Sequence, residues 1–485
     1  MKTSNGGIKK NMIKMDSVLN ENDYGMFSAK LQESLNDENV YAKVLQIEEM
    51  EDGGHMYRFS LINEFMFEVD QYFFAQGNQM PVGSVSEENL RIFRGYHPFI
   101  YEFEGEDFEE LVYQEMRQYE GEWIKIQLKD IDSYGSDEND IVIDGTMVFS
   151  ASPLIRAGKR LCFNRRELGR KEVERLNKIY GKDKIAENTK GCVNNRNTYN
   201  KFLRRIPEDI CKIKGIVYEV GNANNIKLDL ISQKVHCQVL YDVGCGVSYA
   251  ADEKERIKKN LECLFESEFQ AVILSHWDLD HILAVGYYNP RILFAQDQIW
   301  IAPNINLLEP KECSLSAARL AGYVAKNSNL YLANKLGKEL GSRDNVFKLW
   351  QGLGTKKREA THNNNIGIMI EISGAGFWKI ETAKDCLETK KERKIHALLA
   401  GDCPFDNMPE RPKKHTLYDF LITPHHGSDR TVPDIRGEER SAAVICAGSG
   451  GEFPGAEHVN KLRENGFWGI YKTSEDGNIE VELKV

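Results

Sequence analysis

The sequence of 485 residues contains no stretch of about 18 consecutive apolar residues, and its amino-terminal segment MKTSNGGIKKNMIKMDSVLNEN has no apolar core. The first absence argues against a membrane-spanning helix, and the second argues against a secretory signal peptide. The ten cysteines include no Cys-x-x-Cys pair, which argues against a disulfide framework and a structural zinc knuckle. We therefore expect a cytoplasmic protein with reduced thiols and no membrane association.

The chain also lacks an excess of positive charge. Its formal net charge of -11 argues against a protein that coats nucleic acid by bulk electrostatics. One basic segment, residues 156–184, still carries enough Arg and Lys to contact phosphates; the alternative is a charged surface helix. In the acidic residues 102–122, Phe108, Leu111, Val112 and Tyr119 fall at helical spacing, which predicts a solvated amphipathic helix without a functional role.

The organisation of the chain changes near residue 205. The length is too great for one hydrophobic core and indicates two or three domains. Before residue 205, residues 40–62 and 123–150 each read as two strands around a turn. After it, apolar strands alternate with helical stretches and end in polar residues, which favours sheets covered by helices with the chemistry at strand ends. We predict an N-terminal α+β domain at 1–150, a basic helical connecting segment at 151–209, and an α/β domain at 210–485.

Polarity is most concentrated at residues 271–286, AVILSHWDLDHILAVG, where two histidines and two aspartates follow an apolar strand. His276, Asp278, Asp280 and His281 place imidazole and carboxylate groups on a tight loop where they can converge. A divalent cation accepts both kinds of ligand and offsets the negative charge. The set is compatible with zinc, manganese or iron, and its two carboxylates favour a harder ion than an all-histidine set would. The alternative is a polar loop satisfied by backbone donors.

Five collinear elements resemble the metallo-β-lactamase fold, in particular the branch found in ComEC-type competence proteins. SHWDLDH at 275–281 is similar to that branch's SHxDxDH, and PHHGS at 424–428 is identical to its motif. VLYDVG at 239–244, NNNIGIMI at 363–370 and LLAGD at 398–402 resemble its other motifs in order, and the C-terminal residues resemble its closing helix, strand and hairpin. The resemblance covers about residues 210–485, and residues 1–205 resemble no family that we can name.

The resemblance implies an αββα sandwich with two divalent metal ions, Zn or Mn. His276 and Asp278 would bind one ion, Asp280 and His281 would bind the other, and Asp402 would bridge the two; an Asp in a simple Gly-Asp turn is the alternative for Asp402. Either His425 or His426 would complete the second site, and the other would orient substrate or donate a proton. Asp242 would orient a ligand, and Ser428 would support the loop as part of its turn. Asp280, Asp402 and His426 are the residues expected to carry catalysis.

The sequence departs from the family pattern at three places. Glu219 and Asn224, in YEVGNANN, replace the acids of the first strand's usual DVGQGD. Phe453 stands before Pro454 where the family often has histidine, so that a substrate-contacting histidine is lost or His458 replaces it. In the long insertion between residues 281 and 363, His362 is the candidate for a missing histidine of the first metal site.

Two metal ions about 3.5 to 4 Å apart can lower the pKa of a shared water toward neutrality and stabilise charge on a phosphoryl oxygen. With this ligand set and the family precedent, we expect a phosphodiesterase or nuclease, acting on nucleic acid or another phosphodiester. One alternative is a small-molecule hydrolase of an ester, lactone or phosphoester. The other is an effector within a larger complex, which has little activity until a protein partner binds through residues 1–205.

Overall fold

The computed structural model describes fourteen segments of the chain, and every structural statement below concerns these residues. They are residues 40–50, 53–74, 101–107, 109–130, 140–149, 156–164, 168–246, 253–265, 267–286, 297–354, 363–414, 417–429, 434–449 and 453–485. The predicted ligand His362 lies outside them. None of the described helices is both long and apolar enough to cross a membrane.

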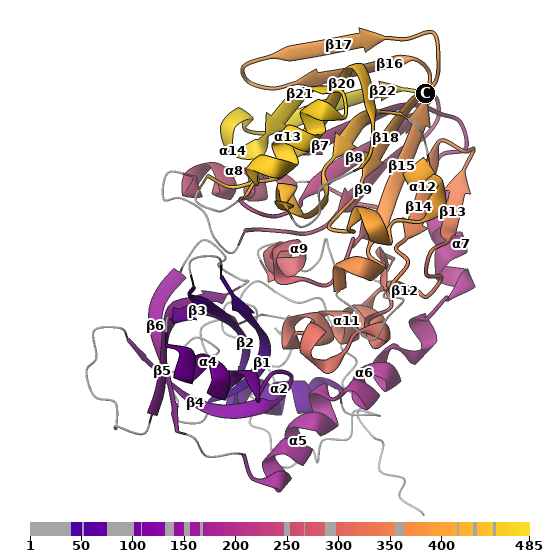
Figure 1. Cartoon of the computed structure of the whole chain (residues 1–485). Helices are drawn as coiled ribbons and strands as arrows, with labels where there is room; N and C mark the ends of the chain where they lie inside the picture. Colours follow the sequence, from indigo (N-terminus) through magenta and orange to yellow (C-terminus); the bar gives the residue numbers. More distant parts are fainter. Residues whose placement is uncertain are drawn as a thin grey trace, which may run out of the picture.

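The N-terminal strands close into a barrel with the order β1-β2-β3-β5-β6-β4 (Figure 1). Successive side chains of a strand point to opposite sides, and this explains the barrel core. Tyr57, Phe59 and Leu61 of β2 are at most 2% exposed and point inward, and the residues between them point outward. Because β4 pairs with both β1 and β6, closure satisfies the backbone donors that an open edge would expose. The strands are β1 (Val40–Glu49), β2 (His55–Asn63), β3 (Tyr101–Asp107), β4 (Trp123–Asp130), β5 (Asp140–Phe149) and β6 (Arg156–Asn164).

Two local predictions were wrong in this half. Residues 156–164, expected as the start of a helical connecting segment, form β6 instead, because pairing with β4 and β5 buries Leu161 in the barrel. Residues 101–107, the first part of the predicted acidic helix, form β3, and only α4 (Glu110–Arg117) is helical there. The helical part of the connecting segment consists of α5 (Arg170–Tyr180), α6 (Lys182–Thr189) and α7 (Arg196–Arg205). The domain boundaries at 150 and 209 stay predictions.

Residues from 210 onward form two mixed sheets. The nine-stranded sheet has the order β12-β11-β10-β9-β8-β7-β22-β16-β17, and the seven-stranded sheet has the order β13-β14-β15-β18-β19-β20-β21. The first comprises β12 (Asn329–Ala333), β11 (Ile299–Pro303), β10 (Ala271–Ile273), β9 (His236–Tyr241), β8 (Ile226–Ser232), β7 (Ile210–Val217), β22 (Ile479–Lys484), β16 (Phe377–Glu381) and β17 (Cys386–Lys390). The second comprises β13 (Glu339–Arg343), β14 (Phe347–Gln351), β15 (Ile368–Gly374), β18 (Ile395–Leu399), β19 (Tyr418–Ile422), β20 (Gly437–Ile445) and β21 (Phe467–Lys472).

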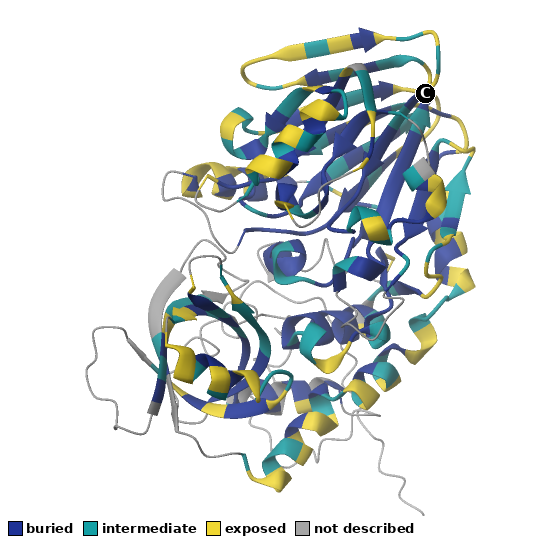
Figure 2. Ribbon diagram, in the orientation of Figure 1, coloured by how far each residue is buried: buried dark blue, intermediate teal, exposed yellow. Residues whose placement is uncertain are grey.

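The two sheets pack face to face. Val239 and Ile273 of one sheet share a buried core with Ile370 and Leu399 of the other. Figure 2 shows β8, β9, β15 and β18 as mostly buried strands between more exposed helices. Fully burying one such side chain stabilises the fold by about 1.5–3 kcal/mol, so this interface is a main source of stability.

Helices cover the outer face of each sheet. Val272, whose neighbour Ile273 faces the other sheet, packs with α8 (Lys254–Phe265) and α11 (Leu315–Asn327). On the seven-stranded sheet, Leu421 packs with Leu462 of α13 (Ala456–Glu464). This layering of helix, sheet, sheet and helix confirms the predicted αββα architecture.

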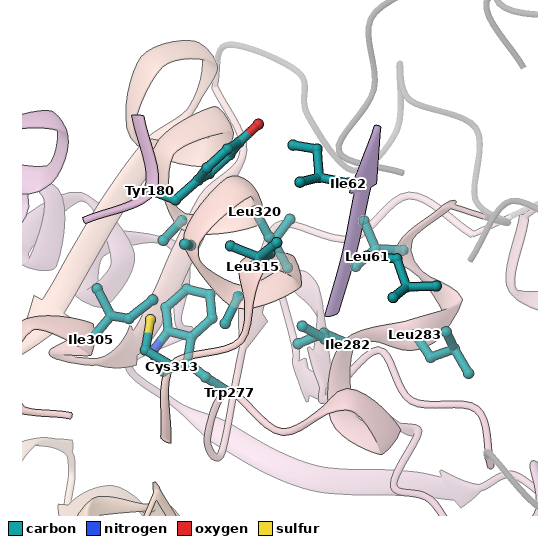
Figure 3. Packing of buried hydrophobic residues seen from close by; sticks show 14 of the residues in the cluster. Leu61, Ile62, Tyr180, Trp277, Ile282, Leu283, Ile305, Cys313, Leu315 and Leu320 are labelled. Atoms are coloured by element: carbon teal, nitrogen blue, oxygen red, sulfur yellow. The ribbon is translucent and has the colours of Figure 1, made fainter. Parts of the chain in front are cut away.

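The barrel packs against the outer helix α11. In Figure 3, Ile62 of β2 lies on the side of Leu315 and Leu320, with Ile282 nearby. The Nε atom of Arg319 lies 2.8 Å from Oδ2 of Asp70, which belongs to α2 (Glu64–Phe74), and Lys43 of β1 donates a 2.9 Å hydrogen bond to the Cys313 carbonyl. The barrel and the outer layer of the sandwich therefore share one buried apolar cluster.

Candidate metal centre

The predicted site residues follow the carboxyl ends of three strands. β10 is parallel to β9 and β11, and β18 is parallel to β19. His276 follows β10, Asp402 follows β18, and His426 follows β19. Ligand sites of α/β sheets form at the carboxyl ends of parallel strands, where the chain leaves the sheet and polar side chains can converge. The fold thus brings together motifs that are far apart in the sequence.

Asp242 fixes the rings of the SHWDLDH loop. This fully buried carboxylate accepts hydrogen bonds from Ser275 N at 2.6 Å and Ser275 Oγ at 2.8 Å, and its Oδ2 lies 2.9 Å from His281 Nδ1. Because a carboxylate only accepts, His281 Nδ1 carries the proton and Nε2 is left as an acceptor. The Ser275 hydroxyl donates to Asp242, so its oxygen accepts from His276 Nδ1 at 2.9 Å. His276 Nε2, which lies 3.1 Å from Asp278 Oδ2, is then the nitrogen of this ring that would bind a cation.

Four side chains converge beyond these rings. One ligand atom from each of Asp280, His281, Asp402 and His426 lies within 4.8 Å of the others. His426 Nε2 is 2.9 Å from Asp280 Oδ2, while its Nδ1 bonds the Cys446 carbonyl at 2.9 Å. Since a carbonyl oxygen also only accepts, His426 Nδ1 keeps its proton, and a metal ion at the cluster would take the place of the proton at Nε2. The arrangement offers two imidazole nitrogens and two carboxylates to one point, a donor set that suits a divalent metal ion.

Two buried atoms of the cluster lack hydrogen-bond partners among the described residues. They are His281 Nε2 and Asp402 Oδ1, which lie 3.3 Å apart. An unpaired polar atom without water costs free energy when buried, and a cation between the two would satisfy both. The orphaned pair therefore fits a metal ion.

Electrostatics favour a cation at the same point. Burial alone would raise the pKa of Asp280, yet His281 and His426 hold that pKa below its usual value. Burial alone would lower the pKa of His281, yet Asp402 and Asp280 raise it well above its usual range. The carboxylates therefore stay ionised at neutral pH and favour protons on the rings, and a bound metal would supply that positive charge in place of the protons.

A second group of ligand atoms adjoins the first. His276 Nε2 lies 3.1 Å from Asp278 Oδ2 and 3.9 Å from Asp402 Oδ2. Asn363 Nδ2 donates a 2.7 Å hydrogen bond to Asp278 Oδ1, and the backbone N–H of Trp277 donates to Asn363 Oδ1. Asp402 thus faces the rings of both groups, as a bridging carboxylate would.

The PHHGS loop separates its two histidines. His425 and His426 both have positive φ, 48° and 53°, which turns the rings in different directions. His426 enters the four-residue cluster, and His425 does not. The His425 ring lies beside Phe453, with centroids 5.9 Å apart. Of the two candidates for the second site, His426 is the one that the geometry favours.

The remaining predicted residues lie around this loop or beyond it. His458 Nδ1 contacts the Ser428 carbonyl at 2.9 Å, so His458 anchors the turn, and the supporting role of Ser428 itself stays a prediction. Neither residue belongs to the cluster. Glu219 lies in an ion pair with Arg256 at 2.9 Å, which gives it a structural partner.

Sequence reasoning missed Ser275, Asn363 and the Cys446 carbonyl. Ser275 opens the SHWDLDH motif, and Asn363 opens NNNIGIMI, so both positions were available as signals. Their role became visible only through bonds between segments, such as the one from Asn363 to Asp278 across 85 positions. The Cys446 carbonyl carries no side-chain signal at all, because any residue type supplies it.

The chain was compared with known proteins. No family model and no curated protein matches it. Among solved structures, it is similar to MEM-A1, a subclass B3 metallo-β-lactamase from a soil metagenome library, with 12% identity, a TM-score of 0.23, and coverage of 43% of this chain and 79% of that one. For the Rm3 metallo-β-lactamase the identity is 13%, the TM-score 0.22 and the coverage 43% and 76%. It is also similar to LRA-12, a class B3 di-zinc metallo-β-lactamase from an Alaskan soil metagenome. The identity is 13%, the TM-score is 0.19, and the match covers 39% of this chain and 63% of that one.

Proposed function

We propose that this chain is a metal-dependent hydrolase of the metallo-β-lactamase fold whose leading reaction is phosphodiester cleavage. One observation carries the proposal: Asp280, His281, Asp402 and His426 converge within 4.8 Å, and the Nδ1 atoms of both imidazoles are bonded elsewhere, which leaves each Nε2 for a cation. Structural ion pairs rarely leave two facing buried atoms, here His281 Nε2 and Asp402 Oδ1, without hydrogen bonds.

The side chains would form the ligand sets of two metal ions. Asp280, His281 and His426 would hold one, His276 and Asp278 would hold the other, and Asp402 would contact both. Bound divalent ions would supply a nucleophile from water at neutral pH and stabilise charge on a phosphoryl oxygen. Asp242 keeps His281 in position through its 2.9 Å contact, and Asn363 keeps Asp278 in position through its 2.7 Å hydrogen bond.

Two features support the finer assignment to the ComEC-type branch and to phosphodiesters. In SHWDLDH, Asp278 occupies a position where other members of the superfamily have a histidine, and carboxylates favour harder ions such as Mn²⁺ over Zn²⁺. Asn363, from the motif that resembles the branch's Asn-bearing strand, holds that same carboxylate. We also propose that residues 1–205 recognise the substrate or a protein partner.

The test is a cleavage assay of the purified full-length protein with Mn²⁺ and with Zn²⁺. Substrates are single- and double-stranded DNA, RNA, bis(p-nitrophenyl) phosphate and a neutral ester. Asp402→Ala removes the bridging carboxylate, and we expect phosphodiester cleavage to fall to background together with loss of bound metal. The matched control is Asp406→Ala, since Asp406 lies four positions away, is 95% exposed and contacts only Lys413 among the described residues.

Each outcome has a distinct meaning. Cleavage that survives Asp402→Ala would refute the assignment of this centre. Hydrolysis of the neutral ester alone would favour the small-molecule hydrolase. Bound metal without turnover on any substrate would favour an effector that needs its partner.

A further inference from the structure

One arginine of the barrel, Arg58, lies on the side of β2 that faces the outer helix α11. In β2, Arg58, Ser60 and Ile62 alternate with the barrel-core residues, so they share the outward side of the strand. Ser60 Oγ accepts a 3.1 Å hydrogen bond from the N–H of Leu315, at the beginning of α11. Figure 3 shows Ile62 on the side of α11, and Leu61 on the other side of β2. The side of β2 that carries Arg58 is therefore the side that faces the hydrolase domain.

The position of Arg58 along β2 leads toward Asp278. β2 passes the beginning of α11 at Ser60, and Arg58 is the next outward residue, about 6–7 Å further along the strand. The residues just before α11 reach the site, because Glu312 Oε2 accepts a 3.2 Å hydrogen bond from the N–H of Asn363. Asn363 in turn holds Asp278. The α-helix α9 (Leu279–Ile282), which carries Asp280 and His281, also contacts α11.

The guanidinium of Arg58 is anchored on one side and open on the other. Its Nε donates to Glu104 Oε2 at 3.1 Å, and its Nη1 donates to Gln46 Oε1 at 3.4 Å. Both partners are its cross-strand neighbours, so the barrel register fixes the side chain. Within the described part of the chain Nη2 makes no hydrogen bond. With 41% of the side chain exposed, a ligand can reach it.

The charges of the metal centre act on Arg58. Burial alone would lower the pKa of its guanidinium, yet Glu104, Asp280 and Asp278 raise that pKa above its usual value. The ionised aspartates of the site are thus close enough to influence a residue of the other half of the protein. A planar guanidinium with free N–H groups suits bidentate contact with phosphate oxygens.

We propose that Arg58 forms an anion-binding subsite above the metal centre and contacts a non-bridging oxygen of the substrate phosphate. This rests on the proposed function, and it names the substrate class as anionic phosphoesters. Glu104 and Gln46 hold the guanidinium in its orientation, and the barrel becomes one wall of the active site.

The test measures the binding of inorganic phosphate to the Mn²⁺-loaded full-length protein by calorimetry. Arg58→Met removes the charge at similar length, Arg58→Lys keeps the charge without the planar fork, and Arg160→Met is the matched control. Arg160 is another barrel arginine whose Nε bonds a carboxylate, that of Asp144, at 2.7 Å. We expect the phosphate Kd to rise about 10- to 100-fold in Arg58→Met and less in Arg58→Lys. We expect Mn²⁺ affinity to stay unchanged, with Arg160→Met like wild type.

Phosphate binding that is equal in wild type and Arg58→Met, or absent from wild type, would overturn the subsite. A parallel loss of Mn²⁺ affinity would overturn it too, since Arg58 would then act only on the fold of the centre. Hydrolysis of bis(p-nitrophenyl) phosphate by the same samples separates the two proposals. Phosphate binding that depends on Arg58, without cleavage of any phosphodiester, would retain the subsite and refute the proposed reaction.

Discussion

At the scale of single residues, the candidate centre depends on side chains that do not themselves face a metal. Asp242 is fully buried and holds His281 directly, while it holds His276 through the Ser275 hydroxyl. An imidazole that can rotate loses ligand geometry and basicity, so an orienting carboxylate strengthens metal binding. The role predicted for Asp242, as an orienting residue, agrees with these contacts and stays a prediction until it is tested.

Replacing Asp242 by Asn tests this role. The substitution keeps the volume but removes the charge, so His281 Nδ1–H loses its anionic acceptor. We expect metal affinity to weaken by about 10- to 100-fold, measured by calorimetry with Mn²⁺ and Zn²⁺. The control is Asp229→Asn, because Asp229 also contacts a histidine at 2.8 Å, but this histidine, His236, is half exposed and does not belong to the cluster. Equal metal affinity in Asp242→Asn and wild type would contradict the role.

At the scale of elements, α11 joins the barrel to the sandwich through a buried ion pair. Arg319 and Asp70 are both at most 2% exposed, and Tyr180 OH donates a 2.6 Å hydrogen bond to the same carboxylate. Three elements that are distant in sequence, α2, α5 and α11, therefore meet at Asp70. A buried pair contributes little when it is complete, but removal of one partner leaves an uncompensated charge.

We therefore expect Arg319→Met to lower the free energy of unfolding by about 3–5 kcal/mol. Urea denaturation followed by circular dichroism measures the change. The double variant Asp70→Asn with Arg319→Met removes the stranded charge and should recover part of the loss. If the double variant loses as much free energy of unfolding as the two single variants together, an uncompensated charge is not the cause of the destabilisation.

At the scale of the whole molecule, Glu102 makes the junction between barrel and sandwich sensitive to pH. Ser60 Oγ donates to Glu102 at 2.8 and 2.9 Å, and Ser316 of α11 donates to it as well. Burial raises the pKa of Glu102 to about 8, and the two serines and nearby arginines only partly oppose it. Because the folded pKa lies above the ordinary value of 4.5, ionisation opposes the folded state.

The stabilising effect of neutral Glu102 is complete below about pH 4.5 and is lost as the pH rises through about 8. We expect the Tm of the wild type to fall between about pH 5 and 8 on the order of several degrees, and Glu102→Gln to flatten that part of the profile. Differential scanning fluorimetry measures both curves. If the Tm of Glu102→Gln falls by the same amount over this pH range, groups other than Glu102 cause the pH dependence.

Much of the structure from residue 210 onward could be predicted from local pattern. The apolar strands before Ser275, Asp402 and Pro424 were identifiable because short apolar runs followed by polar residues mark buried strand ends. The strand β8 was missed although IKLDLIS alternates, and residues 299–351, expected as part of an insertion, add strands to both sheets. Their pairing partners, not their own sequence, decide where they lie.

The sequence by itself determined the motif residues and their order, because these depend on residue type and spacing, and the resemblance that these motifs carry implied the layered architecture. Only the tertiary structure decided that His426 and not His425 enters the cluster, since that choice depends on two positive φ angles. It also decided that residues 156–164 close a barrel, and that β2 carries Arg58 on the side that faces α11. These outcomes depend on contacts between separate segments of the chain, from Gln127 and Cys162 in the barrel to Asp280 and His426 at the centre, and such contacts leave no trace in local sequence.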